Sequence, residues 1–129
     1  MPEPQPSQFQ YAIVRVVPDV ERGECLNAGV ILLCRPRQFL AARVRLDEDR
    51  LRALAPDADP ATIVPHLAAI ERIAAGDSTA GPMARLGQGE RFHWLVAPSS
   101  TVIQASEVHT GLCEDPAVEL DHLFNRLVG

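Results

Sequence analysis

The stretch that decides the fold is YAIVRVVPDVERGECLNAGVILLC, residues 11–34. Residues 11–17 alternate in character and are rich in β-branched side chains, a pattern typical of a β-strand. Pro18 ends this strand, because proline has no N–H to donate to a sheet. A second strand is predicted over Leu26–Cys34. The polar segment between the two strands is short, so they are predicted to form an antiparallel hairpin.

A third strand is predicted over residues 39–46, after a turn at Arg35-Pro36-Arg37. Side chains on a strand alternate between the two faces of the sheet. One face would carry Leu40, Ala42, Val44 and Leu46, and the other Phe39, Ala41, Arg43 and Arg45. Three consecutive strands with short connections favour an antiparallel meander.

Three helical segments are predicted, and each begins at an aspartate that can cap the first turn. These caps are Asp47, Asp59 and Asp115, and a proline follows the last two of them at the position where helices prefer it. The second helix keeps helical spacing up to Gly76, and Pro65 inside it predicts a kink or a restart. The last helix has the strongest apolar pattern, formed by Leu120, Leu123, Phe124 and Leu127.

The second half of the chain completes the predicted order of elements. Residues 76–91 carry four glycines and a proline and are predicted to be a mobile loop. Residues 92–97 and 101–109 are predicted to form a hairpin. The resulting order, βββ-αα-ββ-α, predicts an α+β fold in which helices pack on one face of an antiparallel sheet of about five strands. Residues 1–9 are predicted to be a disordered Pro-rich tail, and residues 10–129 a single domain.

Charge and hydropathy limit the function classes. The net charge is −5 and all twelve basic residues are arginine. Non-specific nucleic-acid binding needs a net basic face, so it is disfavoured for the whole domain, although a local arginine patch stays open. The start, MPEPQPSQ, has neither the basic nor the apolar part of a signal peptide. The longest apolar run, residues 30–34, is far shorter than the ~20 residues that span a bilayer. A cytoplasmic location is therefore predicted.

Cysteine and histidine spacing predicts neither a disulfide framework nor a metal site. The three cysteines, Cys25, Cys34 and Cys113, have no CxxC spacing and are predicted to be reduced, buried thiols. The four histidines show no HxH or HxxxH spacing. His109 and Cys113 could be written as a base and a thiol nucleophile, but the sequence shows no group that would orient them. No cofactor is predicted.

The hairpin loop is the first candidate for a site. Its three carboxylates, Asp19, Glu21 and Glu24, could gather a divalent cation, since oxygen ligands suit Mg²⁺ or Mn²⁺. The favoured alternative is a solvated turn in which Arg22 pairs with a neighbouring acid and Gly23 adopts a positive φ.

The hairpin turn alone does not explain two residues of the second strand, Asn27 and Gly29. Gly29 inside a strand predicts a bulge or a close approach of another backbone. Asn27, two residues earlier, must find hydrogen-bond partners if it is buried.

The arginines Arg15, Arg43 and Arg45 could together line one sheet face and bind an anion or an acidic partner. The favoured alternative is an open, water-facing side of the sheet.

Three segments together resemble a bacterial family known as domain of unknown function 3037. They are YAIVRVVPDVERGECLNAGVIL, ERFHWLVAPSSTVIQASEVHTGL and DPAVELDHLFNRLV. The matching positions in the first two segments include Arg15, Asp19, Arg22, Glu24, Asn27, Gly29, Arg91, Phe92, Gln104, Ser106 and Gly111. The resemblance implies no established activity and no catalytic residue. Genes of that family often lie beside genes for HipA-like kinases, which implies a small accessory or regulatory partner.

Two function hypotheses follow. The first is an interaction module that binds a partner protein, such as a HipA-like kinase, with a homodimer also open. The second is an enzyme or small-ligand-binding domain with a polar pocket around Arg22, Glu24 and Asn27. The candidate residues of that pocket are Arg15, Asp19, Arg22, Glu24, Asn27, Gln104 and Ser106. The first is favoured, because binding sites need less specific chemistry than catalytic ones. Nucleic-acid binding is a distant third.

Overall fold

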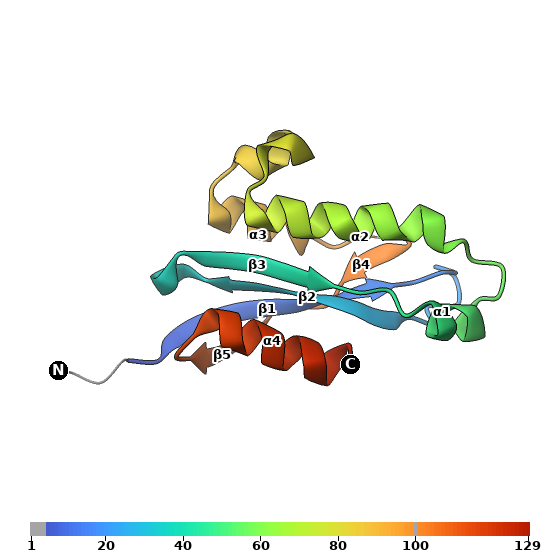
Figure 1. The fold of residues 1–129 in the computed structure, drawn as a ribbon, viewed down its shortest axis with the longest axis horizontal. Helices are drawn as coiled ribbons and strands as arrows, with labels where there is room; N and C mark the ends of the chain where they lie inside the picture. Colours follow the sequence, from blue (N-terminus) through green and yellow to red (C-terminus); the bar gives the residue numbers. More distant parts are fainter. Residues whose placement is uncertain (1–4, 100) are drawn as a thin grey trace.

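Five strands form one antiparallel sheet, and helices lie on both of its faces (Figure 1). The computed structural model describes residues 5–99 and 101–129. The strands are β1 (Ser7–Val16), β2 (Leu26–Cys34), β3 (Phe39–Val44), β4 (Ile103–Ala105) and β5 (His109–Cys113). The helices are α1 (Glu48–Leu54), α2 (Pro60–Ala75), α3 (Gln88–Leu95) and α4 (Pro116–Leu127). The predicted α+β class with an antiparallel sheet of about five strands is confirmed.

The hairpin of β1 and β2 forms as the sequence predicts. Its register shifts by one residue between Val14 and Arg15, which makes Ala28 the additional residue of a bulge. Gly29 lies so close to β3 that a Cβ there would be 2.7 Å from the Arg43 carbonyl oxygen. Both alternatives that the sequence left open for Gly29, a bulge and a close approach, are therefore present.

The sheet order is β3-β2-β1-β4, and β5 also pairs with β1. β4 pairs with residues 14–16 of β1 and β5 with residues 7–11 of the same edge. Ser106 continues the ladder between them. Its N–H donates to the Ile13 carbonyl, and its Oγ accepts the Ile13 N–H, each at 2.8 Å. The predicted second hairpin is not formed, because β4 and β5 each add to the first hairpin.

Both faces of the sheet are covered. One face packs on α1, α2 and α3 through buried side chains that include Val14, Ile31, Leu33, Leu51, Ile63, Leu67 and Phe92. The other packs on α4, through side chains that include Val30, Leu32, Leu120, Leu123 and Phe124. The expectation of helices on one face is therefore wrong. Its physical reason lies in β2, whose unbroken apolar run is the pattern of a strand that is buried on both sides.

The predicted helix caps are confirmed. Asp47, Asp59 and Asp115 each accept a hydrogen bond from a backbone N–H of the first turn. α2 continues through Pro65 without a restart and ends at Ala75, and the residue after it, Gly76, caps the helix with a φ of +76°. None of the helices in the described part of the chain is long and apolar enough to cross a membrane.

Residues 92–97 were predicted as a strand but belong to α3 and its C-terminal end. Phe92 and Val96, four residues apart, both pack on the core, which is helical spacing. Arg91 ties the helix to the end of α2 by donating to the Ala74 carbonyl at 3.4 Å. A short apolar run does not distinguish helix from strand, so these tertiary contacts decide the outcome.

Two further segments differ from the sequence-based expectation. Within the predicted loop of residues 76–91, Ser78–Ala80 and Pro82–Arg85 form short 3-10 helices, and residues 88–91 already belong to α3. β1 begins at Ser7, inside the predicted tail of residues 1–9, and Arg37 donates its Nε to the Ser7 hydroxyl at 2.9 Å. Residues 1–4 of that tail lie outside the described residues.

Candidate functional site

The seven candidate residues from the sequence lie in three separate places. Asp19, Arg22 and Glu24 are in the loop between β1 and β2. Arg15, Asn27 and Gln104 are on three adjacent strands, and Ser106 lies between β4 and β5.

The loop residues bond to one another. The Asp19 carboxylate accepts the N–H groups of Glu21 and Arg22 at 3.1 and 3.4 Å. Gly23 has a φ of +73°, as predicted for this turn. Arg22 pairs with Glu24, with 2.7 Å between Nε and Oε1, and both side chains are exposed. Within the described residues no group of three acidic, histidine or cysteine side chains is placed to hold a metal ion. The arrangement is that of a solvated turn.

Arg15, Asn27 and Gln104 are direct neighbours in one row across the sheet. Arg15 is the register partner of Asn27 on β2 and of Gln104 on β4. Asn27 donates its amide to the Leu127 carbonyl at the end of α4, 3.1 Å away. Gln104 donates to the Thr101 carbonyl at 2.8 Å. The structure brings these three residues together. The side-chain amides of Asn27 and Gln104, however, are already hydrogen-bonded to backbone carbonyls.

Ser106 has a structural position. It is 5% exposed, and its hydroxyl accepts the Ile13 N–H and donates to the Glu107 carbonyl at 2.9 Å. A buried hydroxyl with both functions satisfied is not free to contact a ligand.

The arginine-bearing face of the sheet packs on α4, and Arg43 and Arg45 themselves remain exposed to water. Arg43 and Arg45 both lie over the Phe124 ring, with Cζ 4.5 and 5.9 Å from its centroid. Arg43 also pairs with Asp121, and Arg45 donates to the Gly129 carbonyl. Cations beside the carbonyl end of a helix are favoured by the helix dipole. These two arginines therefore fix α4 to the sheet.

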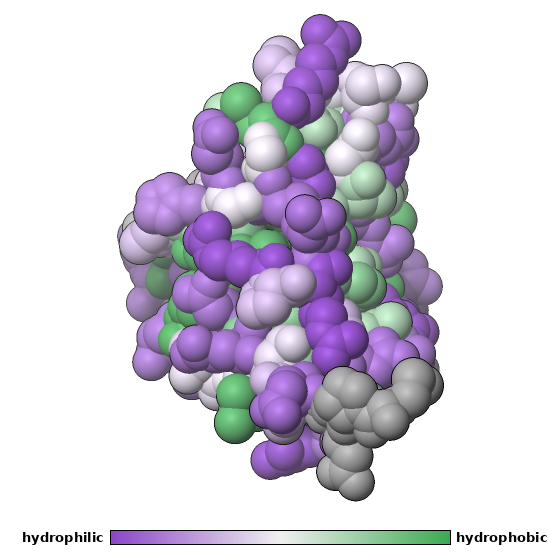
Figure 2. Space-filling model, turned by 90° about the vertical axis from the view of Figure 1, so that its left-hand side faces the viewer, coloured by the Kyte–Doolittle hydropathy of each residue, from purple (hydrophilic) through white to green (hydrophobic). Residues whose placement is uncertain are grey.

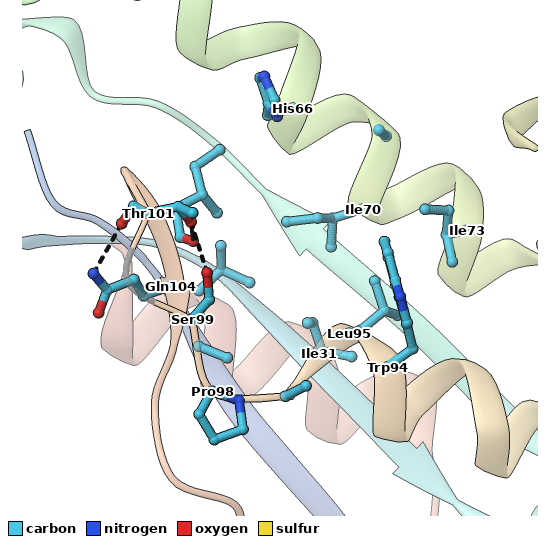
Figure 3. Close-up of a pocket in the computed structure, with 15 residues that line it drawn as sticks. Ile31, His66, Ile70, Ile73, Trp94, Leu95, Pro98, Ser99, Thr101 and Gln104 are labelled. Atoms are coloured by element: carbon cyan, nitrogen blue, oxygen red, sulfur yellow. Dashed lines mark hydrogen bonds between the residues drawn. The ribbon is translucent and has the colours of Figure 1, made fainter. Parts of the chain in front are cut away.

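A cavity that the sequence did not predict lies between α2, α3 and β4 (Figure 3). Its volume is about 330 Å³. Val14 and Ile31 of the sheet form the floor, and Ile70 and Ile73 of α2 form one wall. Trp94 of α3 stands opposite α2 and is 47% exposed. The cavity is thus largely apolar and opens beside a large aromatic ring.

The polar groups of this cavity gather on the segment that leads into β4. The hydroxyls of Ser99 and Thr101 lie 2.9 Å apart. Thr101 also donates to the Ile103 carbonyl at 2.7 Å. His66 faces this segment from α2 (Figure 3). Between the described residues no hydrogen bond joins His66 to either hydroxyl, so the arrangement contains no nucleophile activated by a base.

A family model described as protein of unknown function DUF3037 matches residues 11–128, which is nearly the whole chain. The chain belongs to this family. No curated protein and no solved structure matches it.

The cavity of this DUF3037 member could not be found from sequence spacing, because four distant segments build it. The one local signal was Trp94, the single tryptophan of the chain. Placing residues 92–97 in a strand concealed that Trp94 lies on a helix beside α2.

Cys113 does not have the properties of a nucleophile. Cys34 and Cys113 are buried in the cluster under α4, and Cys25 is exposed. Burial, followed by the neighbouring Cys34, raises the pKa of the Cys113 thiol from 9.0 to about 11. His109 packs beside Tyr11 with the two rings tilted by 35° and 5.2 Å between their centroids. A thiol with a raised pKa is a poor nucleophile at neutral pH.

Proposed function

We propose that this DUF3037 member is a protein-interaction module, an accessory or regulatory partner that holds an apolar side chain of another protein in the cavity beside Trp94. The observation that carries the proposal is the half-exposed Trp94 on the wall of a 330 Å³ cavity. Tryptophan is the residue most enriched among the side chains that dominate binding energy at protein interfaces.

The geometry suits an apolar side chain of a partner protein. The floor belongs to the central strands and one wall to α2, so the cavity is preformed. Ligand pockets begin at about 300 Å³, so the volume is at the lower end of that range. One aromatic or branched aliphatic side chain would fit inside it and would cover the Trp94 ring. The partner is proposed to be a protein with such a side chain exposed at its own surface.

The resemblance in the sequence implies a HipA-like kinase as the first partner to test. Because Trp94 is the only tryptophan, labelling with 5-fluorotryptophan places a single fluorine resonance on the cavity wall. Addition of a HipA-like kinase from the same organism is expected to shift or broaden that resonance. If the kinase binds without changing the fluorine resonance, the interface lies away from Trp94. If the kinase does not bind, it is not the partner.

Two variants provide the energetic test. Trp94→Ala is expected to weaken partner binding at least about thirtyfold, because truncation of such an anchor costs roughly 2 kcal/mol or more. Val64→Ala is the matched control, since Val64 on α2 is also 47% exposed but does not line the cavity. Calorimetric titration of both variants gives the comparison. Equal affinities would contradict the proposal.

A second candidate is a small-ligand-binding domain that uses the same cavity. It is favoured by the hydroxyls of Ser99 and Thr101 and by His66, which could orient the polar end of an amphipathic molecule. The pocket once expected around Arg22, Glu24 and Asn27 supports it less, because Arg22 and Glu24 pair with each other and Asn27 binds α4. Native mass spectrometry of the purified protein tests it, since a retained ligand appears as added mass that Trp94→Ala removes.

A further inference from the structure

The outer edge of β5 is an open strand edge. β5 pairs with β1 on one side, from Ser7–Cys113 to Tyr11–His109. Nothing in residues 5–99 and 101–129 pairs with its other side. No residue of β5 lines the Trp94 cavity. β5 lies toward the left-hand end of the molecule in Figure 1, the end that faces the viewer in Figure 2.

The register shows which backbone groups of β5 point outward. Ile13 directs both its N–H and its C=O toward Ser106. The odd-numbered residues of β1 therefore direct their N–H and C=O groups toward the side where β5 lies. Their partners on β5 are His109, Gly111 and Cys113. The N–H and C=O groups of Thr110 and Leu112 therefore point away from the sheet.

The outer edges of β3 and β5 differ in how far their backbone groups are capped. On β3, the outward N–H of Val44 is capped by the Glu71 carboxylate of α2 at 2.8 Å. β5 has no such cap within the described chain, and its five residues carry no Asp, Glu, Arg or Lys. Leu112 on it is 69% exposed. An unprotected edge of this kind is a template for pairing with another chain.

The flanking charges decide which chain the edge accepts. Glu107 precedes β5, and Glu114 and Asp115 follow it, with no arginine anywhere in residues 107–115. Glu107 and Glu114 are exposed, and neither forms an ion pair with another described residue. Along residues 107–115 the centre is thus uncharged and both ends are acidic. The nearby arginines belong to the turn after β2, where Arg37 bonds the Ser7 hydroxyl on the inner side of β5.

A second copy of the chain does not fit these charges. The antiparallel arrangement that pairs all outward groups of Thr110 and Leu112 is symmetric about Gly111. It sets Glu107 of one copy opposite Asp115 of the other at both ends. Like charges directly opposite in a sheet are destabilising. Charge complementarity instead favours a strand with basic ends.

We propose that the outer edge of β5 is a second interaction surface, which accepts an extended segment of a partner protein as an additional antiparallel strand. The segment is uncharged at its centre and carries arginine or lysine at both ends. Backbone hydrogen bonds to Thr110 and Leu112 supply the affinity, and the acidic flanks select the segment.

The test uses two synthetic nonapeptides with the same alternating Thr/Val centre, one with arginine at both ends and one with glutamate. Binding is followed by fluorescence anisotropy of the labelled peptides and by the amide resonances of Thr110 and Leu112. The arginine-ended peptide is expected to bind about tenfold more tightly at low salt, and salt should reduce the difference. Equal binding of the two peptides, no binding of the arginine-ended one, or unmoved Thr110 and Leu112 resonances would overturn the proposal.

Leu112→Pro removes an outward N–H and keeps the inward pairing, which is where proline is tolerated on an edge strand. It should weaken the arginine-ended peptide about tenfold, while Leu112→Thr, which keeps the N–H, stays within about threefold. If Leu112→Pro does not fold, Glu107→Arg combined with Glu114→Arg decides instead. That double variant is expected to prefer the glutamate-ended peptide, and an unchanged preference would contradict the proposal.

Two further measurements distinguish peptide binding at the β5 edge from binding in the Trp94 cavity and from dimer formation. Trp94→Ala is expected to leave peptide binding unchanged, so the edge and the cavity can fail independently. Sedimentation velocity of the free protein is expected to show a monomer. A dimer that Leu112→Pro dissociates would identify a second copy as the occupant and overturn the proposal.

Discussion

Asn27 donates its side-chain amide to the carbonyl oxygen of Leu127, 100 residues further along the chain, at 3.1 Å. The bond joins β2, in the hairpin that decides the fold, to the last turn of the helix that covers one face of the sheet. It also explains a polar residue at the start of an apolar strand, since the terminal carbonyls of a helix have no partner within the helix.

Asn27→Ala is therefore expected to lower the free energy of unfolding by about 1–2 kcal/mol, because it removes a part-buried hydrogen bond and leaves the Leu127 carbonyl without its donor. Urea unfolding followed by circular dichroism measures the change. Gln104→Ala is the matched control, because its amide bonds an exposed loop carbonyl and its loss should cost about 0.5 kcal/mol or less. A loss as small for Asn27→Ala as for the control would show that the bond to α4 contributes nothing.

Gly29→Ala tests the close approach of β2 and β3. The added Cβ would lie 2.7 Å from the Arg43 carbonyl oxygen and 2.8 Å from Val44 Cγ1, so the backbone itself has to move. The expected loss is about 1–3 kcal/mol, the range for overpacking a tight site. At Gly87, the N-cap of α3, a Cβ would meet only Glu90 Oε1 at 3.7 Å, so Gly87→Ala should cost only about 0.5 kcal/mol, the loss of a favoured cap residue. If both variants melt at the same temperature, close packing is not the reason for a glycine at position 29.

The parts of the fold that the sequence predicts correctly are those decided by neighbours in the chain. The first hairpin follows from alternating side chains, Pro18 and Gly23. The three helix starts follow from aspartates that cap their own first turns. In each case the interacting atoms are separated by only a few residues, so the local sequence is enough to predict the structure.

The parts that could not be predicted are decided by contacts between distant segments. Residues 92–97 become a helix because Phe92 is buried against the sheet and Arg91 reaches the end of α2. α4 covers the second face because β2 buries both of its sides. Among the candidate residues, Arg15 and Asn27 are register partners on adjacent strands. The Trp94 cavity needed the positions of α2, α3 and β4 together.

Ser106→Ala tests whether the hydroxyl completes the ladder between β4 and β5. Without the Oγ, the buried Ile13 N–H loses its acceptor, and an unsatisfied buried donor costs about 1–3 kcal/mol. Hydrogen exchange should accelerate at the Ile13 amide more than at other amides of β1. Ser99→Ala is the control, because Ser99 is exposed and bonds only the Thr101 hydroxyl among described residues. Unchanged exchange at Ile13 would mean that another group, such as a water molecule, can replace the hydroxyl.

The buried Cys113 thiol predicts how reactivity and stability change at high pH. Its pKa is raised to about 11, mainly by burial, whereas Cys25 is exposed. At pH 8 a thiol reagent should therefore modify Cys25 in the folded protein and reach the two buried thiols only after unfolding. Between pH 9 and 11 the unfolded chain releases the Cys113 proton and the folded chain retains it. The folded state then holds more protons than the unfolded state, so stability falls as pH rises through this window.

Urea unfolding at pH 8.5 and 10.5 measures this loss, and Cys113→Ala is the reference that removes the titrating group. The wild-type protein should lose more stability over this interval than Cys113→Ala does, because both share every other titrating side chain. If the two proteins lose the same amount, the Cys113 thiol is not the group whose proton is held by folding.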